Sequence, residues 1–456
     1  MTTKEASFSS LKISSELLQV VEELGYKTLT PVQEKSIPVL LEGKDLIGQS
    51  KTGSGKTAAF SIPILEKIDL RDRKVQALIL CPTRELCTQV AREIRKLGRR
   101  HMGLQVLILA GGQPIRPQLS ALYKGAHIVV GTPGRILDHL RRNPVNLKDI
   151  STLVLDEADR MLDMGFEEEM TEILDAIPKD RQTVLFSATY PESIEEMSES
   201  YQTNPVRVTI EDEDKLKTKI EQIIYEVEAE DKFNAVLWAL NEYKPESAII
   251  FCNLKITVKE LNRNLIDAGV SAACLHGDLE QPDRDKVMAK FRNGSVRILI
   301  ATDVAARGID IADLDLVCNY DLPNQSEIYT HRIGRTGRAG KSGLAISFAT
   351  PDEDFKLENL ERKTIGDLNV EAVENNDAGM ETLFISGGRK DKMRPGDILG
   401  ALTGDGAGLK GDQVGKIEIH DRFSYVAVSK EVSRLALTRL RNGRIKGKKF
   451  RIELVR

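Results

Sequence analysis

Residues 50–57, Ser-Lys-Thr-Gly-Ser-Gly-Lys-Thr, have the composition of a loop that binds phosphate. Glycines let backbone N–H groups approach phosphate oxygens, and the helix expected to follow adds positive potential at its N-terminus. The Lys56 ammonium would reach the β- and γ-phosphates of a nucleotide, and the Thr57 hydroxyl would bind Mg²⁺. The alternative is a Gly/Ser loop that binds nothing. In the nucleotide-binding reading, the phosphate cradle is formed by Thr52, Gly53, Ser54 and Gly55.

A second candidate site is the acidic box Asp156-Glu157-Ala158-Asp159, which follows an apolar run. A carboxylate at the end of a buried strand costs free energy unless it meets a metal or a cation. Asp156 would hold Mg²⁺ through water, and Glu157 would orient and deprotonate an attacking water molecule. Taken alone, such acidic pairs are mostly solvated caps. A position about 100 residues after the phosphate loop favours nucleotide hydrolysis.

Composition limits the class of protein. The chain has 456 residues, enough for two or three domains, with 41% hydrophobic and 29% charged residues, as in soluble globular proteins. The five cysteines form no close pair with metal-ligand spacing, which indicates reduced thiols in a cytoplasmic protein. We expect no signal peptide and no membrane span, because the first residues lack the pattern and no apolar run is long enough.

The charge is unevenly distributed. Residues 381–456 contain 17 Lys and Arg against 9 Asp and Glu, a net charge of +8, whereas the rest of the chain carries −12. A basic unit on an acidic body suggests a segment that binds a polyanion, although a solubilising surface explains the charge equally well.

Short, wholly apolar runs alternate with longer helix-like segments, which is typical of parallel sheets buried on both faces. The pattern predicts strands over residues 77–81, 127–130, 152–155, 183–186, 248–252, 296–301, 314–318 and 344–348. It predicts helices over residues 85–99 and 255–268. A polar, charged run and an acidic, Asn-containing run divide the chain. We expect a first lobe over 1–208, a linker over 209–218, a second lobe over 219–365, a linker over 366–380 and a small domain over 381–456.

The order of these motifs resembles that of DEAD-box helicases, from Phe8 to about Phe348. The resemblance implies an α/β fold of two RecA-like lobes that bind ATP and RNA. It assigns Gln33 to adenine recognition, because its amide can donate to N7 and accept from the exocyclic amine, and it assigns Tyr26 to base stacking. For Tyr26 and Phe8 the alternative is core packing.

The resemblance also implies roles in the second lobe, where residues 331–338 read His-Arg-Ile-Gly-Arg-Thr-Gly-Arg. If this segment is helical, Arg335 and Arg338 share one face and act as arginine fingers on the γ-phosphate. The alternative is a basic surface helix. Ser187-Ala188-Thr189 is expected to bond Asp159 and His331. Two further residues are assigned to the nucleotide, Gly308 and Asp310, with Asp310 resembling the family's ribose contact.

The remaining family motifs hold glycine, hydroxyl and basic residues, which suit phosphate and sugar oxygens rather than base edges. They therefore predict an RNA grip without sequence recognition. The residues assigned to RNA are Pro82, Thr83, Arg84, Gly112, Thr132, Arg135, Asn253, Arg284 and Thr302.

The last 75 or so residues predict a β-α-β-β-α-β order, as in RRM-like domains. Residues 423–426 only partly resemble the aromatic ribonucleoprotein motif, so base stacking on the sheet is in doubt and a basic loop is the better RNA contact. That loop contains Arg444, Lys446, Lys448 and Lys449. Residues 393–404 and 443–447 are similar to the DbpA group of bacterial DEAD-box proteins, which implies a large-subunit ribosomal RNA hairpin as ligand. The alternative is a non-specific RNA anchor.

Together the motifs predict an ATP- and Mg²⁺-dependent RNA helicase that unwinds duplexes locally. The resemblance adds a tether to large-subunit ribosomal RNA and a role on pre-ribosomal particles in the cytoplasm. Two other classes remain open at this stage, a DNA translocase on the same scaffold and a non-catalytic RNA clamp or remodelling scaffold.

Overall fold

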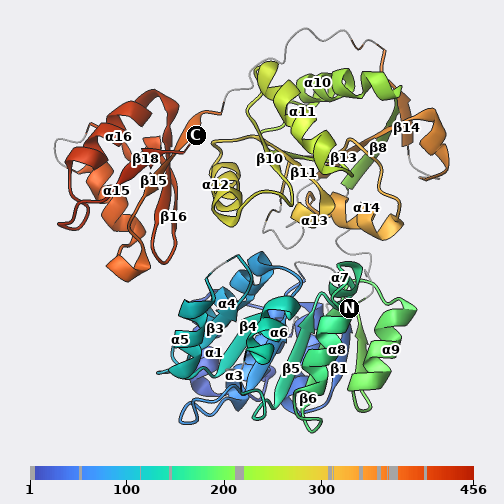
Figure 1. Cartoon of the computed structure of the whole chain (residues 1–456), viewed down its shortest axis with the longest axis vertical. Coiled ribbons are helices and arrows are strands. Elements are labelled where there is room, and N and C mark those ends of the chain that lie inside the picture. The colour runs from blue at the N-terminus through green and yellow to red at the C-terminus, as the bar shows by residue number, and fades with distance from the viewer. Residues whose placement is uncertain are drawn as a thin grey trace. The chain divides into compact units, whose positions relative to one another are not determined.

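The computed structural model contains three sheets in the part of the chain that it describes (Figure 1). Contacts divide the chain into two compact units, and the boundary between them in the sequence falls near residue 215. The described residues are 6–50, 54–112, 114–142, 146–210, 220–306, 311, 313–337, 343–356, 361–366, 368, 378–404 and 408–455.

The first lobe is a parallel sheet with helices on both faces. Its strands lie in the order β3-β4-β2-β5-β6-β1-β7. They are β1 (Leu46–Gln49), β2 (Ala77–Leu80), β3 (Val106–Leu109), β4 (Ile128–Gly131), β5 (Thr152–Asp156), β6 (Gln182–Ser187) and β7 (Val206–Thr209). The helices are α1 (Ser15–Glu23), α2 (Pro31–Leu41), α3 (Lys56–Lys67), α4 (Arg84–Leu97), α5 (Ile115–Tyr123), α6 (Pro133–Arg141), α7 (Ala158–Asp163), α8 (Glu167–Asp175) and α9 (Glu192–Tyr201).

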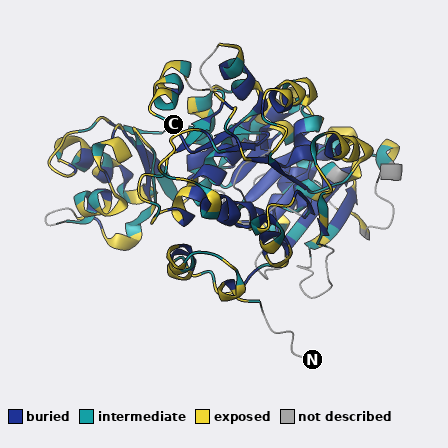
Figure 2. Cartoon of the chain, turned by 90° about the horizontal axis from the view of Figure 1, so that it is seen from below, coloured by how far each residue is buried: buried dark blue, intermediate teal, exposed yellow. Residues whose placement is uncertain are grey.

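The apolar runs are continuous because both faces of this sheet are buried (Figure 2). Along β2, Ile79 packs into one core and its neighbours Leu78 and Leu80 pack into the core on the other face. Successive side chains of a strand point to opposite faces, so a strand covered on both sides needs an apolar residue at every position.

The second lobe repeats the topology of the first. Its sheet has the order β10-β11-β9-β12-β13-β8-β14. Counted along the chain, both sheets follow 3-4-2-5-6-1-7, so the two lobes are one fold used twice. The strands are β8 (Ile220–Glu226), β9 (Ala248–Phe251), β10 (Ala272–Leu275), β11 (Ile298–Ala301), β12 (Leu316–Asn319), β13 (Gly343–Ala349) and β14 (Glu361–Thr364). The helices are α10 (Lys232–Tyr243), α11 (Lys255–Asp267), α12 (Gln281–Arg292), α13 (Asp303–Ala306) and α14 (Ser326–Ile333).

The C-terminal domain has the expected β-α-β-β-α-β order. Its antiparallel sheet is β16-β17-β15-β18. The elements are β15 (Met380–Ile385), α15 (Pro395–Thr403), β16 (Val414–Ile419), β17 (Ser424–Ser429), α16 (Ser433–Asn442) and β18 (Ile452–Leu454). One face of the sheet packs on α15 and α16 through residues such as Leu383 and Val426.

The other face of this small sheet contacts the second lobe, which belongs to the same compact unit. The side-chain amide of Asn293 donates to the Thr382 hydroxyl at 2.8 Å, and that hydroxyl lies 2.9 Å from the Ser295 hydroxyl. Tyr425 on this face is 3% exposed. Its ring is therefore covered and does not present a stacking platform for bases.

All eight predicted strands and both predicted helices of the lobes are present, with ends shifted by at most two residues. Several strands were not predicted, among them β3 and β8. None of the described helices is long and apolar enough to cross a membrane.

Candidate nucleotide and RNA sites

The strand order divides the carboxyl edge of the first sheet into two halves. β5, β6 and β1 are adjacent, so the acidic box, Ser187 and the phosphate loop all follow neighbouring strands. β3, β4 and β2 form the other half, and each is followed by residues assigned to RNA. Ligands of open parallel sheets bind at this edge. The motifs predicted to bind the nucleotide follow one half of the sheet, and the motifs predicted to bind RNA follow the other half.

The phosphate loop leads directly into α3, as predicted. Gly55 precedes the helix with φ of +98°, a left-handed conformation that glycine adopts without strain. The buried Lys56 ammonium donates to the Ser50 carbonyl at 3.0 Å, and the Ser50 and Ser54 hydroxyls lie 3.0 Å apart. Thr57 is half-buried in the first turn of α3. Thr52 and Gly53 lie outside the described residues.

Gln33 contacts the phosphate loop itself. Its side-chain amide donates to the Gly55 carbonyl at 3.2 Å, and its side-chain oxygen accepts from the Thr30 N–H at 3.0 Å. A Cβ at position 55 would lie 2.5 Å from Gln33 Nε2, so this close approach requires glycine. Adenine recognition by Gln33 stays a prediction, and the contact ties the residue to the phosphate site.

Tyr26 stacks on Phe8 with ring centroids 6.0 Å apart, and its hydroxyl donates to Glu93. Burial, together with the hydrogen bond to Glu93, raises the pKa of Tyr26 well above its usual value. Phe8 is 3% exposed and belongs to the core of the lobe. The packing alternative therefore describes Phe8, whereas Tyr26 remains half-exposed.

Asp156 has the properties expected of a magnesium ligand. It is buried, and its Oδ1 has no hydrogen-bond partner among the described residues. Burial raises the pKa of Asp156 to about 6, an effect that the nearby Lys56 charge opposes. No group of three His, Cys, Asp or Glu that could hold a metal occurs in the described parts of the chain. This donor set fits Mg²⁺, which is bound by one or two protein groups together with phosphates and water.

Asp159 fixes the end of β6 against the acidic box. Its Oδ2 accepts from the N–H groups of Ala188 and Thr189 at 3.1 and 3.0 Å, and from the Thr189 hydroxyl at 3.1 Å. Burial would raise the pKa of Asp159, but the hydrogen bonds from Thr189 and Ser187 and the charges of Lys56 and Arg160 together outweigh burial, so the pKa is lowered. The predicted bond from this serine-threonine motif to Asp159 is present.

The helix on which Arg335 and Arg338 would share one face does not extend to Arg335. α14 ends at Ile333, and Arg335 lies in the turn that follows, where its N–H donates to the Arg332 carbonyl. Gly334 ends the helix, and the chain then pairs through Thr336 with Leu314. The roles of the two arginines stay predictions. Outside the described residues lie Arg338, Gly308 and Asp310.

Arg332, which the sequence did not single out, is the centre of the second lobe's carboxyl edge. Its guanidinium binds both oxygens of Asp303 at 2.7 Å and also donates to the side-chain oxygens of Asn253 at 2.7 Å and Asn319 at 3.1 Å. It is 1% exposed and stands over the Phe251 ring. One side chain thus joins the ends of β9, β11 and β12. Its only sequence signal was membership of the 331–338 motif.

In the RNA half of the first lobe, Gln118 connects two predicted motifs. Its amide donates to the Ala110 carbonyl at 3.1 Å, while its oxygen accepts from Arg135 at 3.1 Å and lies 2.8 Å from Nε2 of the buried His139. Arg84 reaches the Gly112 carbonyl at 3.5 Å. These contacts bring the three segments together. No sequence motif points to Gln118.

Other residues assigned to RNA end or begin helices. The Thr83 hydroxyl caps α4 by accepting from the Leu86 N–H at 3.2 Å. Pro82 precedes it in the loop after β2, and Thr132 immediately precedes α6. Helix N-termini with free hydroxyl groups favour phosphate oxygens.

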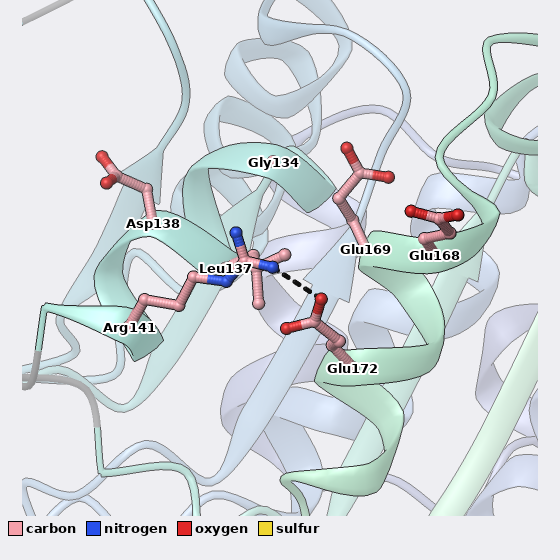
Figure 3. A pocket seen from close by; sticks show the side chains of 7 residues that line it. All are labelled: Gly134, Leu137, Asp138, Arg141, Glu168, Glu169 and Glu172. Atoms are coloured by element: carbon pink, nitrogen blue, oxygen red, sulfur yellow. Dashed lines mark hydrogen bonds and ion pairs between the residues drawn. The ribbon is translucent and has the colours of Figure 1, made fainter.

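A pocket of about 280 Å³ lies between α6 and α8 (Figure 3). It contains four carboxylates against one guanidinium, and Arg141 already binds Glu172 at 2.6 Å. Phosphate groups are repelled by such a lining. RNA contacts on α6 are therefore expected at its N-terminal end. The pocket is lined by Gly134, Leu137, Asp138, Arg141, Glu168, Glu169 and Glu172.

In the second lobe, Arg284 and Thr302 meet at α13. The Arg284 guanidinium donates to the Ala305 carbonyl at 3.1 Å, and the Thr302 hydroxyl accepts from the Ala305 N–H at 3.4 Å. Asn253 donates through its side chain to the Leu322 carbonyl at 2.9 Å and remains exposed.

The basic loop of the C-terminal domain is a tight turn. Ile445 and Lys448 exchange backbone hydrogen bonds of 2.9 and 3.1 Å, and both central residues, Lys446 and Gly447, have positive φ. This is the geometry of a rigid type I′ turn. Lys446 donates to the Lys392 carbonyl at 2.9 Å. Lys446, Lys448 and Lys449 are all exposed to solvent.

A cavity of about 520 Å³ lies at the start of this turn, between the C-terminal ends of α15 and α16. Its described lining combines two guanidinium groups with glycine backbone and contains no carboxylate, which suits an anionic ligand. The lining residues are Gly400, Ala401, Gly404, Arg439, Leu440, Asn442, Gly443 and Arg444.

Three family models match the chain. DEAD/DEAH box helicase matches residues 30–197, helicase conserved C-terminal domain matches 231–340, and DbpA RNA binding domain matches 382–454. The chain is 47% identical over 457 residues to the ATP-dependent RNA helicase DbpA of Escherichia coli, covering 99% of this chain and all of the relative. It is 46% identical over 358 residues to the DEAD-box ATP-dependent RNA helicase CshA of Bacillus anthracis, covering 78% and 68% of the two chains. The structure of S. cerevisiae Dbp5 bound to RNA and ADP BeF3 superposes with a TM-score of 0.69 at 32% identity, covering 79% of this chain and 95% of that one.

Proposed function

Because this chain belongs to the DEAD-box family of ATP-dependent RNA helicases and carries a DbpA-type RNA-binding domain, we propose that it unwinds short RNA duplexes beside a large-subunit ribosomal RNA hairpin. The C-terminal domain would hold the hairpin while the lobes act on neighbouring duplex. Such a tether raises the effective concentration of one substrate for a core that does not read sequence. The process served is ribosome assembly on pre-ribosomal particles in the cytoplasm.

The observation that carries the tether is the position of the rigid basic turn and the guanidinium-lined cavity. Both lie within residues 382–454, which match the DbpA RNA-binding domain. The turn fixes the backbone from Ile445 to Lys448, so little backbone order must be created on binding, and Lys448 and Lys449 are exposed. Tyr425 is covered, whereas Phe384 and Phe423 beside it are partly exposed, and the basic edge is the RNA contact that we propose.

For hydrolysis, we propose that Lys56 binds the β- and γ-phosphates and that Thr57 and Asp156 hold Mg²⁺. When bound, Mg²⁺ neutralises charge on the phosphate oxygens. Glu157 orients the attacking water and accepts its proton. Arg335 and Arg338 stabilise the charge of the departing phosphoryl group.

Glu157→Gln tests the role of the base. General-base removal should lower RNA-stimulated hydrolysis by about 10²–10⁴-fold, while nucleotide binding is retained. Glu172→Gln, on the exposed face of α8, is the matched control and should hydrolyse ATP at the normal rate. Undiminished turnover by Glu157→Gln would exclude the role given to it.

The tether is tested with the full chain and two RNA hairpins, one from the large-subunit ribosomal RNA and one unrelated. Replacing Lys448 and Lys449 by Ala should weaken ribosomal hairpin binding, and the slope of log affinity against log salt should fall by about 0.7–0.9 per contact removed. Lys410→Ala is the control, an exposed lysine of the same domain. Equal affinity of the unsubstituted chain for both hairpins would favour a non-specific anchor.

Single-stranded DNA should not stimulate hydrolysis.

A further inference from the structure

The acidic box contains a buried ion pair that the proposed hydrolysis does not yet use. The Arg160 guanidinium donates to Glu157 Oε2 at 2.8 Å. The two side chains are only 5% and 6% exposed. Arg160 thus holds one oxygen of the Glu157 carboxylate in a fixed place, away from solvent.

The backbone gives this pair a fixed geometry. Glu157 has φ of +56°, a left-handed conformation between β5 and α7 that is unusual for a residue with a side chain. Arg160 follows in the first turn of α7, where its N–H donates to the Glu157 carbonyl at 3.1 Å and to Asp159 Oδ1 at 2.9 Å. The strained residue and its partner are thus locked together at the junction of strand and helix.

Asp159 extends the same network to β6. Its other oxygen, Oδ2, binds the backbone and hydroxyl of Thr189. The contacts therefore run from Thr189 through Asp159 to the backbone N–H of Arg160, whose side chain binds Glu157. Hydrogen-bonded supports of this kind hold reacting groups in productive orientation.

We propose that Arg160 is a positioning residue for ATP hydrolysis, which holds the Glu157 carboxylate oriented toward the attacking water. The inference rests on the base role proposed for Glu157. Arg160 acts through that carboxylate and does not itself contact the nucleotide. A simple stabilising pair would affect folding and nucleotide binding, whereas a positioning residue affects the rate of turnover.

The test uses the full chain with Arg160→Met, which keeps length and removes charge. Misplacement of a catalytic group costs about 10²-fold, so we expect kcat to fall by about that factor while KM for ATP and for RNA stays within about threefold. Arg160→Lys should recover about tenfold of the loss. Arg71→Met, which breaks an exposed pair with Asp69, is the control and should leave kcat unchanged. A kcat for Arg160→Met within about threefold of normal would overturn the proposal, since the proposal predicts a loss of kcat of about 10²-fold.

A double variant separates this inference from the proposed function. If Arg160 acts only through Glu157, Glu157→Gln/Arg160→Met should show the same residual rate as Glu157→Gln. A further drop equal to that of Arg160→Met alone would overturn the positioning role. Full activity in Glu157→Gln would contradict the base itself, independently of Arg160. Should Arg160→Met fail to fold, Arg160→Gln replaces it, with the same separation of kcat from KM expected.

Discussion

Replacement of Arg332 by Met should destabilise the second lobe far more than the loss of an ordinary arginine. Asp303, whose side chain is 20% exposed, would keep its charge without its partner, and breaking a buried pair costs about 3–5 kcal/mol. The buried side-chain oxygen of Asn319 would also lose its donor, at about 1 kcal/mol. Because Asp303 is partly solvated, we expect the two contributions together to amount to about 3–5 kcal/mol.

Hydrogen exchange of the full chain is the appropriate assay, because a chain with several domains does not unfold in one step. Amides of β9, β11 and β12 should exchange about 10²–10⁴-fold faster, which corresponds to the expected loss at 1.4 kcal/mol per factor of ten. Amides of β2 and β4 in the first lobe should not change. Arg362→Met removes an exposed pair with Glu226 in the same lobe and should cost at most about 1 kcal/mol.

A loss below about 1 kcal/mol in Arg332→Met would refute this reasoning, since that is the range of surface pairs. The charge argument has its own test. Adding Asp303→Asn to Arg332→Met removes the unpaired carboxylate, so part of the stability should return. A double variant less stable than Arg332→Met would show that the cost arises from packing around Phe251 and not from the orphaned charge.

Three further predictions concern the first lobe. Gly55→Ala should raise KM for ATP about tenfold or more, because about 1–3 kcal/mol of backbone strain and a clash with Gln33 distort the phosphate loop. An unchanged KM in steady-state hydrolysis would contradict this prediction. Gln118→Met should weaken RNA binding in equilibrium titrations while ATP binding is kept, because Arg135 loses its acceptor. Burial, and to a smaller extent the Arg135 charge, lowers the pKa of His139 in the folded chain. As pH falls, the unfolded chain therefore binds a proton at His139 before the folded chain does. The stability of the folded chain should fall as pH drops below 6.5, the ordinary pKa of histidine. Urea unfolding at several pH values should show this slope, and His139→Gln should reduce it.

The sequence predicted the central strands well because burial on both faces forces continuous apolar runs. β8 escaped prediction because its sequence, Ile-Glu-Gln-Ile-Ile-Tyr-Glu, includes polar residues that are tolerated near the sheet edge. The phosphate loop and the acidic box could be predicted because their chemistry depends on neighbouring residues.

The contacts that support these motifs could not be predicted in the same way. Gln118 reaches Arg135 across 17 positions, and Arg332 reaches Asn253 across 79. Nothing local in the sequence encodes such pairs, because they depend on strand order. The sequence leaves open whether residues 331–338 form one helix, because the motif contains a glycine between its arginines. α14 ends at Ile333, directly before that glycine.

The shared strand order gives each residue that follows a strand of one lobe a counterpart in the other lobe. α3 follows the first strand of its lobe and begins at Lys56, and α10 follows the first strand of the other lobe and begins at Lys232. Lys232 is buried, and its ammonium nitrogen lies 3.5 Å from Glu353 Oε2 and 3.9 Å from Asp321 Oδ1. In the second lobe, internal carboxylates thus lie beside this lysine, at the place that corresponds to the proposed phosphate position beside Lys56, and the lysine forms a structural salt bridge.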